Sequence, residues 1–138
     1  MTAATPTPRA LIFGAIGTLV ETSDLQRRAF NAAFLEAGLP WQWSAEDYAA
    51  RLARPGGKRR ISEEAERRGL TIDAVALHAR KSEIFRTMIG SVGLPLRPGV
   101  AEVIAAARAA GLPLGLATTT ARATVDALLA QAGPPALT

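Results

Sequence analysis

The chain has 138 residues, of which 49% are hydrophobic, so it is long enough for one ordinary domain or for two small ones. It has no cysteine, which excludes a disulfide framework and a thiolate metal site, and no apolar run reaches the roughly 18 residues of a membrane span. The formal net charge of +4 comes from basic residues spread over several segments, which favours small anions as much as nucleic acid. We therefore expect a cytoplasmic protein with a packed core and no membrane partner.

The first part of the chain is predicted to hold one short strand and four helices. Residues 1–8, rich in Thr and Pro, are expected to be a disordered lead-in, and an apolar strand follows over residues 10–13. Residues that suit helix caps, and Gly or Pro residues that stop a helix, then delimit four consecutive helices. These run from a Thr22 or Ser23 cap to Ala37, over 45–52, over 58–68, and from a Thr71 or Asp73 cap to Ile89.

The last part of the chain is predicted to complete a strand, helix, strand unit. A helix over residues 100–110 ends at Gly111, an apolar strand covers residues 114–117, and a final helix runs to about Gln131. Two strands joined through helices in this way need a right-handed parallel crossover, and the four earlier helices are an insertion within it. Residues 134–138 are expected to form a second disordered tail.

The segment that follows the first strand, residues 13–19, reads Phe-Gly-Ala-Ile-Gly-Thr-Leu. It resembles the opening motif of the haloacid dehalogenase-like (HAD) hydrolases, in which Asp-x-Asp-Gly-Thr-Leu follows such a strand. Within that family the chain is most similar to the CbbY-like branch, which groups with beta-phosphoglucomutase and sugar-phosphate phosphatases. The stretches that carry the resemblance keep the family's order and are Glu21–Thr22, Leu25–Asn31, Trp41–Trp43, Gly56–Lys58, Leu96–Val100 and Ala117–Thr120.

The resemblance implies an α/β fold, a partial HAD-like Rossmannoid core of two parallel strands with flanking helices, into which a helical cap domain is inserted. The core would comprise residues 9–20 and 93–133, and the cap domain residues 21–92. Only two of the family's core strands are recognised, so the chain resembles a truncated member. Two parallel strands leave both sheet edges open, and open edges pair with a missing half, a partner chain or a second copy.

Two positions of the opening motif lack the family's chemical groups. In HAD hydrolases the first Asp attacks the phosphoryl group and the second moves a proton at the leaving oxygen, and both tasks need a carboxylate. Gly14 and Ile16 occupy these positions here. The family also uses Mg²⁺, whose side-chain carboxylate ligands are absent from this chain, so no cofactor is expected. The resemblance thus implies a hydrolase homologue that is catalytically inactive.

Candidate phosphate-binding groups remain at the ends of both predicted strands. Gly17 and Thr18 offer backbone N–H groups to a phosphate, or they form only a turn. Thr118 stands where the family's second motif has a Thr or Ser that binds phosphoryl oxygens, and Thr119 adds a further donor. Strand-end and helix-cap duty is the alternative explanation for these threonines.

A second candidate anion site precedes the third predicted helix. Residues 55–60 combine a Gly-rich turn with three basic residues, and cations at a helix N-terminus are unfavourable, which makes an anion partner plausible. By the resemblance, Gly57 and Lys58 lie on the loop of the cap domain that faces the substrate. A solvated helix start is the alternative. His78, the only histidine, is interpreted as a helix-face residue.

The sequence leaves three functions open. The first is a catalytically silent homologue that binds phosphate or a phosphosugar weakly. The second is an interaction or regulatory module that self-associates or pairs its sheet edge with another chain, and the third is a protein with residual phosphatase activity. Nucleic-acid binding is not expected, because the basic residues form no clustered face and no reading motif is present.

Overall fold

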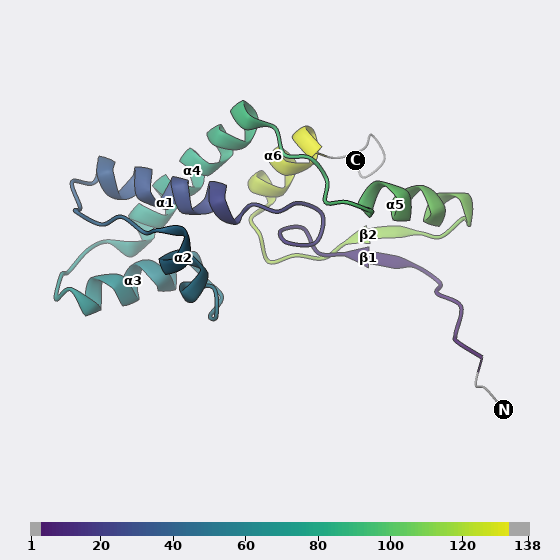
Figure 1. Ribbon diagram of the computed structural model, residues 1–138, viewed down its shortest axis with the longest axis horizontal. Coiled ribbons are helices and arrows are strands. Elements are labelled where there is room, and N and C mark those ends of the chain that lie inside the picture. Colours follow the sequence, from purple (N-terminus) through teal and green to yellow (C-terminus); the bar gives the residue numbers. More distant parts are fainter. Residues whose placement is uncertain (1–3, 133–138) are drawn as a thin grey trace. The chain divides into compact units, whose positions relative to one another are not determined.

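The computed structural model describes residues 4–132 of the chain (Figure 1). The elements of this part are β1 (Leu11–Phe13), α1 (Ser23–Glu36), α2 (Ala45–Arg51), α3 (Gly57–Arg67), α4 (Ala74–Val92), α5 (Val100–Ala109), β2 (Leu114–Leu116) and α6 (Arg122–Ala132). Residues 4–8 are exposed and belong to no helix or strand. The rest of the two expected tails, residues 1–3 and 134–138, lies outside the described residues. None of the helices in the described part is long and apolar enough to cross a membrane.

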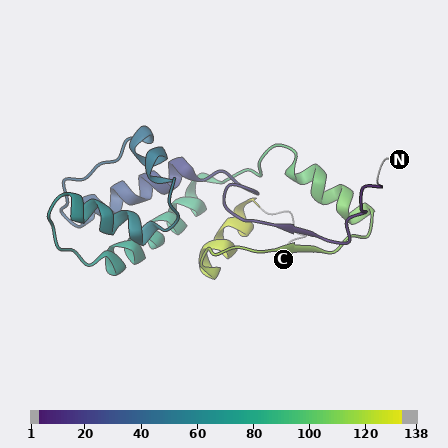
Figure 2. The same cartoon turned by 90° about the horizontal axis from the view of Figure 1, so that it is seen from below.

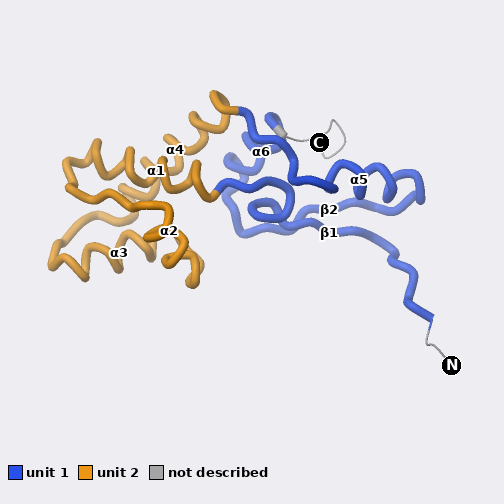
Figure 3. The backbone as a smooth tube through the Cα atoms, viewed as in Figure 1, with its two compact units in different colours: residues 1–22, 93–138 blue, residues 23–92 orange. Residues whose placement is uncertain are grey.

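The chain divides into two compact units (Figure 3). Residues 1–22 and 93–138 make up one of them, which we call the sheet unit because it holds β1, β2, α5 and α6. Residues 23–92 make up the other, which we call the helical unit because it holds α1 to α4. Along the sequence, the helical unit is therefore an insertion between β1 and α5.

Within the sheet unit, β1 and β2 lie side by side as a parallel pair (Figure 2). The register places Phe13 beside Leu116. The Leu11 N–H donates to the Pro113 carbonyl at 3.0 Å, and the Ala117 N–H donates to the Phe13 carbonyl at 2.8 Å. Parallel strands need a crossover connection, which is the topology that the order of the predicted elements requires. The predicted α/β fold with a two-stranded parallel sheet is confirmed.

Ile12 shows how much of this sheet is left uncovered in the described part of the chain. Its side chain belongs to β1 and the residue is 71% exposed. Successive residues of a parallel strand direct their backbone groups to opposite edges, and Leu11 and Phe13 bond toward β2. The N–H and C=O groups of Ile12 therefore face the edge away from β2, where no third strand pairs within residues 4–132.

The small core of the sheet unit forms between the loop after β1 and the last helix. Ala15, Leu19 and Val20 of the loop are buried. They line the same apolar space as the buried Val125 and Leu128 of α6. Burial of these side chains holds the loop in place, because each one removes apolar area from water.

The helical unit is built around a cluster of aromatic side chains. Phe30 and Phe34 lie one turn apart on α1, and the Trp43 ring packs against both, with centroid distances of 5.0 and 4.8 Å. Aromatic pairs of this kind contribute roughly 0.5–1.5 kcal/mol beyond the burial of their area. The buried members of the cluster are Phe30, Phe34, Trp41, Trp43, Tyr48, Ile61 and Ala65.

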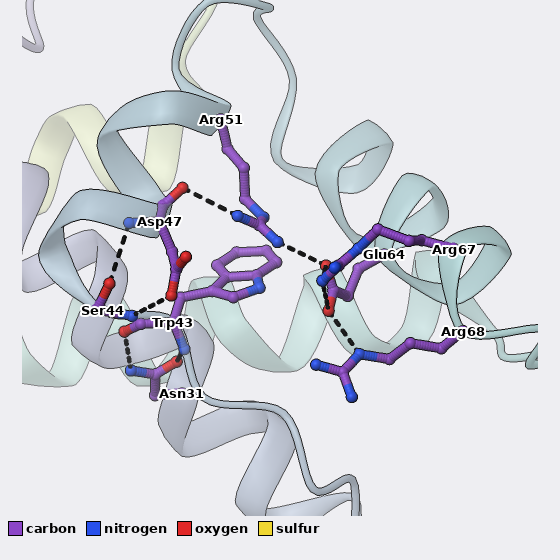
Figure 4. Close-up of polar contacts among 8 residues, drawn as sticks. All are labelled: Asn31, Trp43, Ser44, Asp47, Arg51, Glu64, Arg67 and Arg68. Atoms are coloured by element: carbon purple, nitrogen blue, oxygen red, sulfur yellow. Dashed lines mark hydrogen bonds and ion pairs between the residues drawn. The ribbon is translucent and has the colours of Figure 1, made fainter.

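Asn31 on α1 fixes the segment that carries Trp43 into this cluster (Figure 4). Its Oδ1 accepts from the Trp43 N–H at 2.8 Å, and its Nδ2 donates to the Trp43 carbonyl at 2.9 Å.

We expect Asn31→Leu to lower the free energy of unfolding by about 1–3 kcal/mol, because the backbone N–H of a buried residue loses its acceptor. Urea unfolding followed by tryptophan fluorescence measures this, and an unchanged midpoint would contradict the assignment.

A buried carboxylate joins α2 to α3 (Figure 4). Glu64 accepts hydrogen bonds from Arg51 of α2 at 2.7 Å, from Arg67 at 2.7 and 2.8 Å, and from Arg68 at 2.6 Å. Burial raises the pKa of Glu64, but the hydrogen bonds from the three arginines outweigh this effect and lower the pKa to about 2. The carboxylate therefore stays ionised at neutral pH and ties the two helices together.

The helix α4 differs from its prediction at the C-terminal end. The sequence predicts an end at Ile89 because Gly90 follows, whereas α4 continues to Val92. Gly93 has a φ of 67°, the left-handed conformation that commonly follows the last turn of a helix, and Gly90 is not among the glycines with positive φ. A glycine inside a helix lowers its stability by about 1 kcal/mol without ending it. The glycine that ends α4 is Gly93.

Candidate functional site

The loop between β1 and α1, residues 14–20, is closed by hydrogen bonds within the sheet unit. The Gly17 N–H donates to the Val20 carbonyl at 2.8 Å, and the Arg97 N–H donates to the Leu19 carbonyl at 2.8 Å. The Arg97 guanidinium also donates to the Gly17 carbonyl. Both backbone groups of Gly17 are thus engaged within the sheet unit. This hydrogen bond agrees with the alternative that Gly17 forms a turn, and a role of Gly17 and Thr18 toward a phosphate stays a prediction.

Gly14 and Ile16, at the two positions where the HAD motif has aspartates, carry no group that could react. A Cβ added at Gly14 would lie 3.0 Å from the Thr18 Oγ1, so the Thr18 hydroxyl lies close to the space that a longer side chain would enter. Ile16 is 38% exposed. The loop presents hydroxyl and backbone groups but no carboxylate at the end of β1.

The residues at the carboxyl ends of β1 and β2 do not fit a Mg²⁺ ion. Magnesium in proteins is held by one or two carboxylates together with substrate oxygens and water. Residues 14–20 and 117–120, which follow the two strands, contain neither Asp nor Glu. Residues 4–132 also contain no group of three His, Cys, Asp or Glu side chains that could hold a metal ion.

The threonines after β2 lie at the same end of the sheet as the loop after β1. Phe13 and Leu116 are register partners, so the chain leaves both strands at their carboxyl ends, which is where parallel sheets bind ligands. The Thr118 Oγ1 accepts from the Thr120 N–H and contacts the Thr120 Oγ1, both at 3.1 Å. Thr118 thus has a turn-forming role before α6, and Thr118 and Thr119 are both exposed at this end. Their role toward a phosphate stays a prediction.

The second candidate site, in the helical unit, begins where α3 begins. Gly56 precedes the helix with a φ of 105° and has no side chain to cap it, and the first turn holds no acidic residue. Gly57 is packed closely, since a Cβ there would lie 2.6 Å from the His78 Nε2. Lys58 and Arg59 are exposed and border an open hollow of about 660 Å³. The structure therefore places Gly57 next to His78 and Lys58 at the edge of this hollow.

A residue that the sequence interpretation did not select lies beside this site. Lys81 on α4 is 6% exposed, and its Nζ lies 4.4 Å from the Phe30 ring centroid and 5.1 Å from the Phe85 ring centroid. The Nζ donates to the Gln26 Oε1 of α1. Burial, and then the charge of Arg60, lower the pKa of Lys81 to about 8.

The pKa of His78 is lowered as well, first by burial and then by the charges of Lys81, Lys58 and Arg60. His78 lies on α4 and is half-buried, so its side chain is partly shielded from solvent. One signal in the sequence could have found Lys81. It follows His78 by three residues and precedes Phe85 by four, which places a lysine on the apolar stripe of α4.

Comparison with known proteins identifies relatives over almost the whole chain. A profile of the haloacid dehalogenase-like hydrolases matches residues 8–136. Protein CbbY, plasmid, of Cupriavidus necator is 48% identical over 131 residues, which cover 88% of this chain and 51% of that protein. Protein CbbY of Rhodobacter capsulatus is 47% identical over 125 residues, which cover 88% of this chain and 55% of that protein. The chain spans about half the length of the curated relatives it matches.

The comparison with solved structures finds proteins of the same kind. The crystal structure of CbbY from Rhodobacter sphaeroides in complex with phosphate superposes with a TM-score of 0.81 at 38% identity, covering 93% of this chain and 59% of that one. A mutant of the same protein, in complex with xylulose-(1,5)bisphosphate, gives the same values. The match of the family profile, the relatives and the shared fold lead to one conclusion: the chain belongs to the haloacid dehalogenase-like hydrolase family.

Proposed function

We propose that this chain is a cytoplasmic HAD-like homologue of the CbbY type that binds phosphate or a phosphosugar weakly and does not cleave the phosphate ester. The observation that carries the proposal is the loop after β1, where Gly14 and Ile16 replace both carboxylates of the family motif. Without a carboxylate, the first position has no nucleophile and the second has no group that moves a proton.

The energetics of phosphate-ester cleavage support this proposal. Phosphate monoesters are among the slowest uncatalysed hydrolyses, so an enzyme lowers the barrier by 20 kcal/mol or more, on the order of the largest known enhancements. Hydrogen bonds from Thr18 and Thr118 are worth a few kcal/mol at most, roughly 1–3 each when the partner is charged. Binding without turnover is therefore the function that these residues can perform.

Each of the two candidate sites, taken by itself, offers groups that suit a phosphate. The Thr18 and Thr118 hydroxyls and the exposed backbone after β2 offer neutral hydrogen-bond donors in the sheet unit. Lys58, next to Gly57 in the helical unit, offers a positive charge. The relative from Rhodobacter sphaeroides was crystallised with xylulose-(1,5)bisphosphate, which supports a bisphosphorylated pentulose as the ligand class to test first.

A turnover assay tests the absence of chemistry. We expect the chain, incubated with xylulose 1,5-bisphosphate, glucose 1-phosphate or glucose 6-phosphate and Mg²⁺, to release inorganic phosphate at the rate of buffer alone. Saturable release that increases with protein concentration would overturn the proposal. Thr118→Ala is the matched control. Phosphate release by this chain at the ends of the strands would change in the variant, whereas release by a contaminating phosphatase would stay the same.

A second candidate function rests on the uncovered edge of β1. Ile12 is 71% exposed and its backbone groups face away from β2, so this edge can accept a strand from a second copy or another chain. We expect the chain to sediment as an associated species, and Ile12→Lys to shift it toward the monomer, since a lysine on a strand edge opposes pairing. A monomer at all concentrations, with a native fold, would exclude this function.

A further inference from the structure

Arg97 joins the connection before α5 to the loop that follows β1. Its backbone N–H donates to the Leu19 carbonyl at 2.8 Å, and its guanidinium donates to the Gly17 carbonyl. The residue is exposed, and it belongs to none of the salt bridges formed within residues 4–132. No carboxylate of this part of the chain therefore draws the guanidinium away from Gly17.

The hydrogen bond from the guanidinium acts on the peptide group between Gly17 and Thr18. The Gly17 carbonyl and the Thr18 N–H belong to the same planar unit, and in a trans peptide they point in opposite directions. No peptide bond in the described part of the chain is cis. While Arg97 holds the carbonyl, the Thr18 N–H is therefore directed away from the guanidinium.

The Thr18 N–H has no acceptor within the described part of the chain. The amides on either side of it do have one. The Gly17 N–H donates to the Val20 carbonyl at 2.8 Å, and the Leu19 N–H donates to the Ala15 carbonyl at 2.9 Å. Thr18 is exposed, and a Cβ built at Gly17 would meet no atom within 4 Å, so the loop is open here. An exposed N–H without a protein acceptor can bond water or an anion.

The peptide between Gly17 and Thr18 depends on Arg97 for its orientation. Its N–H makes no hydrogen bond to the described residues, and its carbonyl accepts from the Arg97 guanidinium. Gly17 has a φ of 82°, and glycine adopts positive and negative φ about equally readily, so the backbone alone does not fix this peptide. The backbone bond of Arg97 ends on Leu19, beyond the peptide in question.

We propose that Arg97 is a positioning residue for phosphate binding, which holds the Gly17–Thr18 peptide so that the Thr18 N–H stays free to donate to a phosphate oxygen. Thr18 then offers two donors, its N–H and its hydroxyl. The hydroxyl rotates to suit a ligand, whereas the N–H depends on the conformation of the loop. The inference rests on the proposed binding of phosphate at the strand ends, and it names a donor there and the side chain that orients it.

The first test needs no phosphate. The Gly17 carbonyl carbon and the Thr18 amide are observed by NMR in the unaltered chain, in Arg97→Met and in Arg9→Met. Methionine keeps an unbranched apolar stem but has no donor. Arg9 is exposed and precedes β1 at the other end of the strand, so its replacement removes the same charge without touching the loop. We expect both resonances to move in Arg97→Met and to stay in place in Arg9→Met, and unmoved resonances in Arg97→Met would overturn the proposal.

Titration with inorganic phosphate then tests the donor. We expect phosphate to shift the Thr18 amide of the unaltered chain saturably, and to bind Arg97→Met roughly two- to tenfold more weakly, the range that one hydrogen bond accounts for. Arg9→Met should bind phosphate as the unaltered chain does. Arg97→Lys, which keeps a donor able to reach a carbonyl, should restore part of the affinity and part of the Gly17 carbonyl shift. Equal affinity of Arg97→Met and the unaltered chain would overturn the positioning role, and so would weaker binding without a change at the Gly17 carbonyl, because charge alone would then explain it.

The Thr118 amide separates this inference from the proposed function. If phosphate shifts the Thr118 amide and leaves the Thr18 amide unmoved, the strand ends bind phosphate but Arg97 presents no donor to it. If phosphate shifts neither amide, the proposed binding fails together with the inference. Arg97 is exposed and its backbone bond to Leu19 does not need the side chain, so we expect Arg97→Met to fold like the unaltered chain.

Discussion

Replacing Glu64 by glutamine is expected to lower the free energy of unfolding by about 3 kcal/mol, the low end of the cost of breaking a buried ion pair. Glu64 is 2% exposed, and its carboxylate bonds Arg51, Arg67 and Arg68 at 2.6 to 2.8 Å. The value lies at the low end because the three arginines keep contact with water, with side chains 22%, 63% and 39% exposed. Tryptophan fluorescence during urea unfolding measures the effect, since Trp41 and Trp43 lie in the neighbouring core.

The same helix offers a matched control. Glu63 pairs with Arg54 at 3.3 Å, but both side chains are exposed, at 46% and 72%. Glu63→Gln is expected to change the free energy of unfolding by less than about 1 kcal/mol, the usual worth of a surface ion pair. Equal effects of the two substitutions would contradict the buried role of Glu64.

The pH dependence of stability should identify the same carboxylate. The pKa of Glu64 is lowered in the folded protein to about 2, so its stabilising contribution is complete above the unfolded pKa near 4.5 and is lost as the pH falls from there toward 2. The native chain is therefore expected to lose stability in this window, whereas Glu64→Gln should lose less. A difference between the two proteins that stays constant from pH 6 to pH 3 would contradict the assignment.

Putting aspartates at both motif positions is expected to create a Mg²⁺ site at the end of β1, where residues 14–20 carry no carboxylate. Gly14 is not among the residues with positive φ, so a side chain is compatible with its backbone, and only the Thr18 hydroxyl must move to admit a Cβ. Two carboxylates at one strand end suffice for weak binding of this ion. We expect Gly14→Asp with Ile16→Asp to bind Mg²⁺ with a millimolar dissociation constant. Binding then stabilises the fold by about 1.4 kcal/mol when free Mg²⁺ is at ten times that constant.

Isothermal titration calorimetry measures the affinity of each variant for Mg²⁺. The double variant with asparagines at positions 14 and 16 is the matched control, because it has the same shape without the charges. The unaltered chain and the asparagine variant should give no heat of binding. If the unaltered chain binds Mg²⁺ as tightly as the aspartate variant, ligands other than the motif positions hold the ion. The loss of the two motif carboxylates would then not explain a lack of phosphate-ester cleavage.

Most of the fold follows from local patterns in the sequence. Apolar residues at helical spacing and the stop at Gly38 predict α1 to within a residue, and Ser44 with Asp47 forms the capping box that begins α2. The error at the end of α4 arises because the sequence shows where a glycine is but not its φ. Gly90 and Gly93 look alike in the sequence, and only the conformation of the chain distinguishes them.

The candidate site was less predictable, because it depends on contacts between distant segments. The absence of carboxylates at Gly14 and Ile16 can be read directly from the motif. The engagement of the Gly17 backbone cannot, since it depends on Val20 and on Arg97 from a segment 80 residues away. The environment of Lys81 likewise needs Gln26, which lies 55 residues earlier in the chain.

The measurement that tests the account most directly is a ³¹P NMR time course of xylulose 1,5-bisphosphate mixed with a stoichiometric amount of the chain and Mg²⁺. It observes binding and cleavage in one sample. We predict that the ligand's phosphate resonances shift or broaden as protein is added, while no inorganic phosphate accumulates. Growth of an inorganic phosphate signal in proportion to the protein, or ligand resonances that the protein leaves unchanged, would contradict a chain that binds phosphate esters without cleaving them.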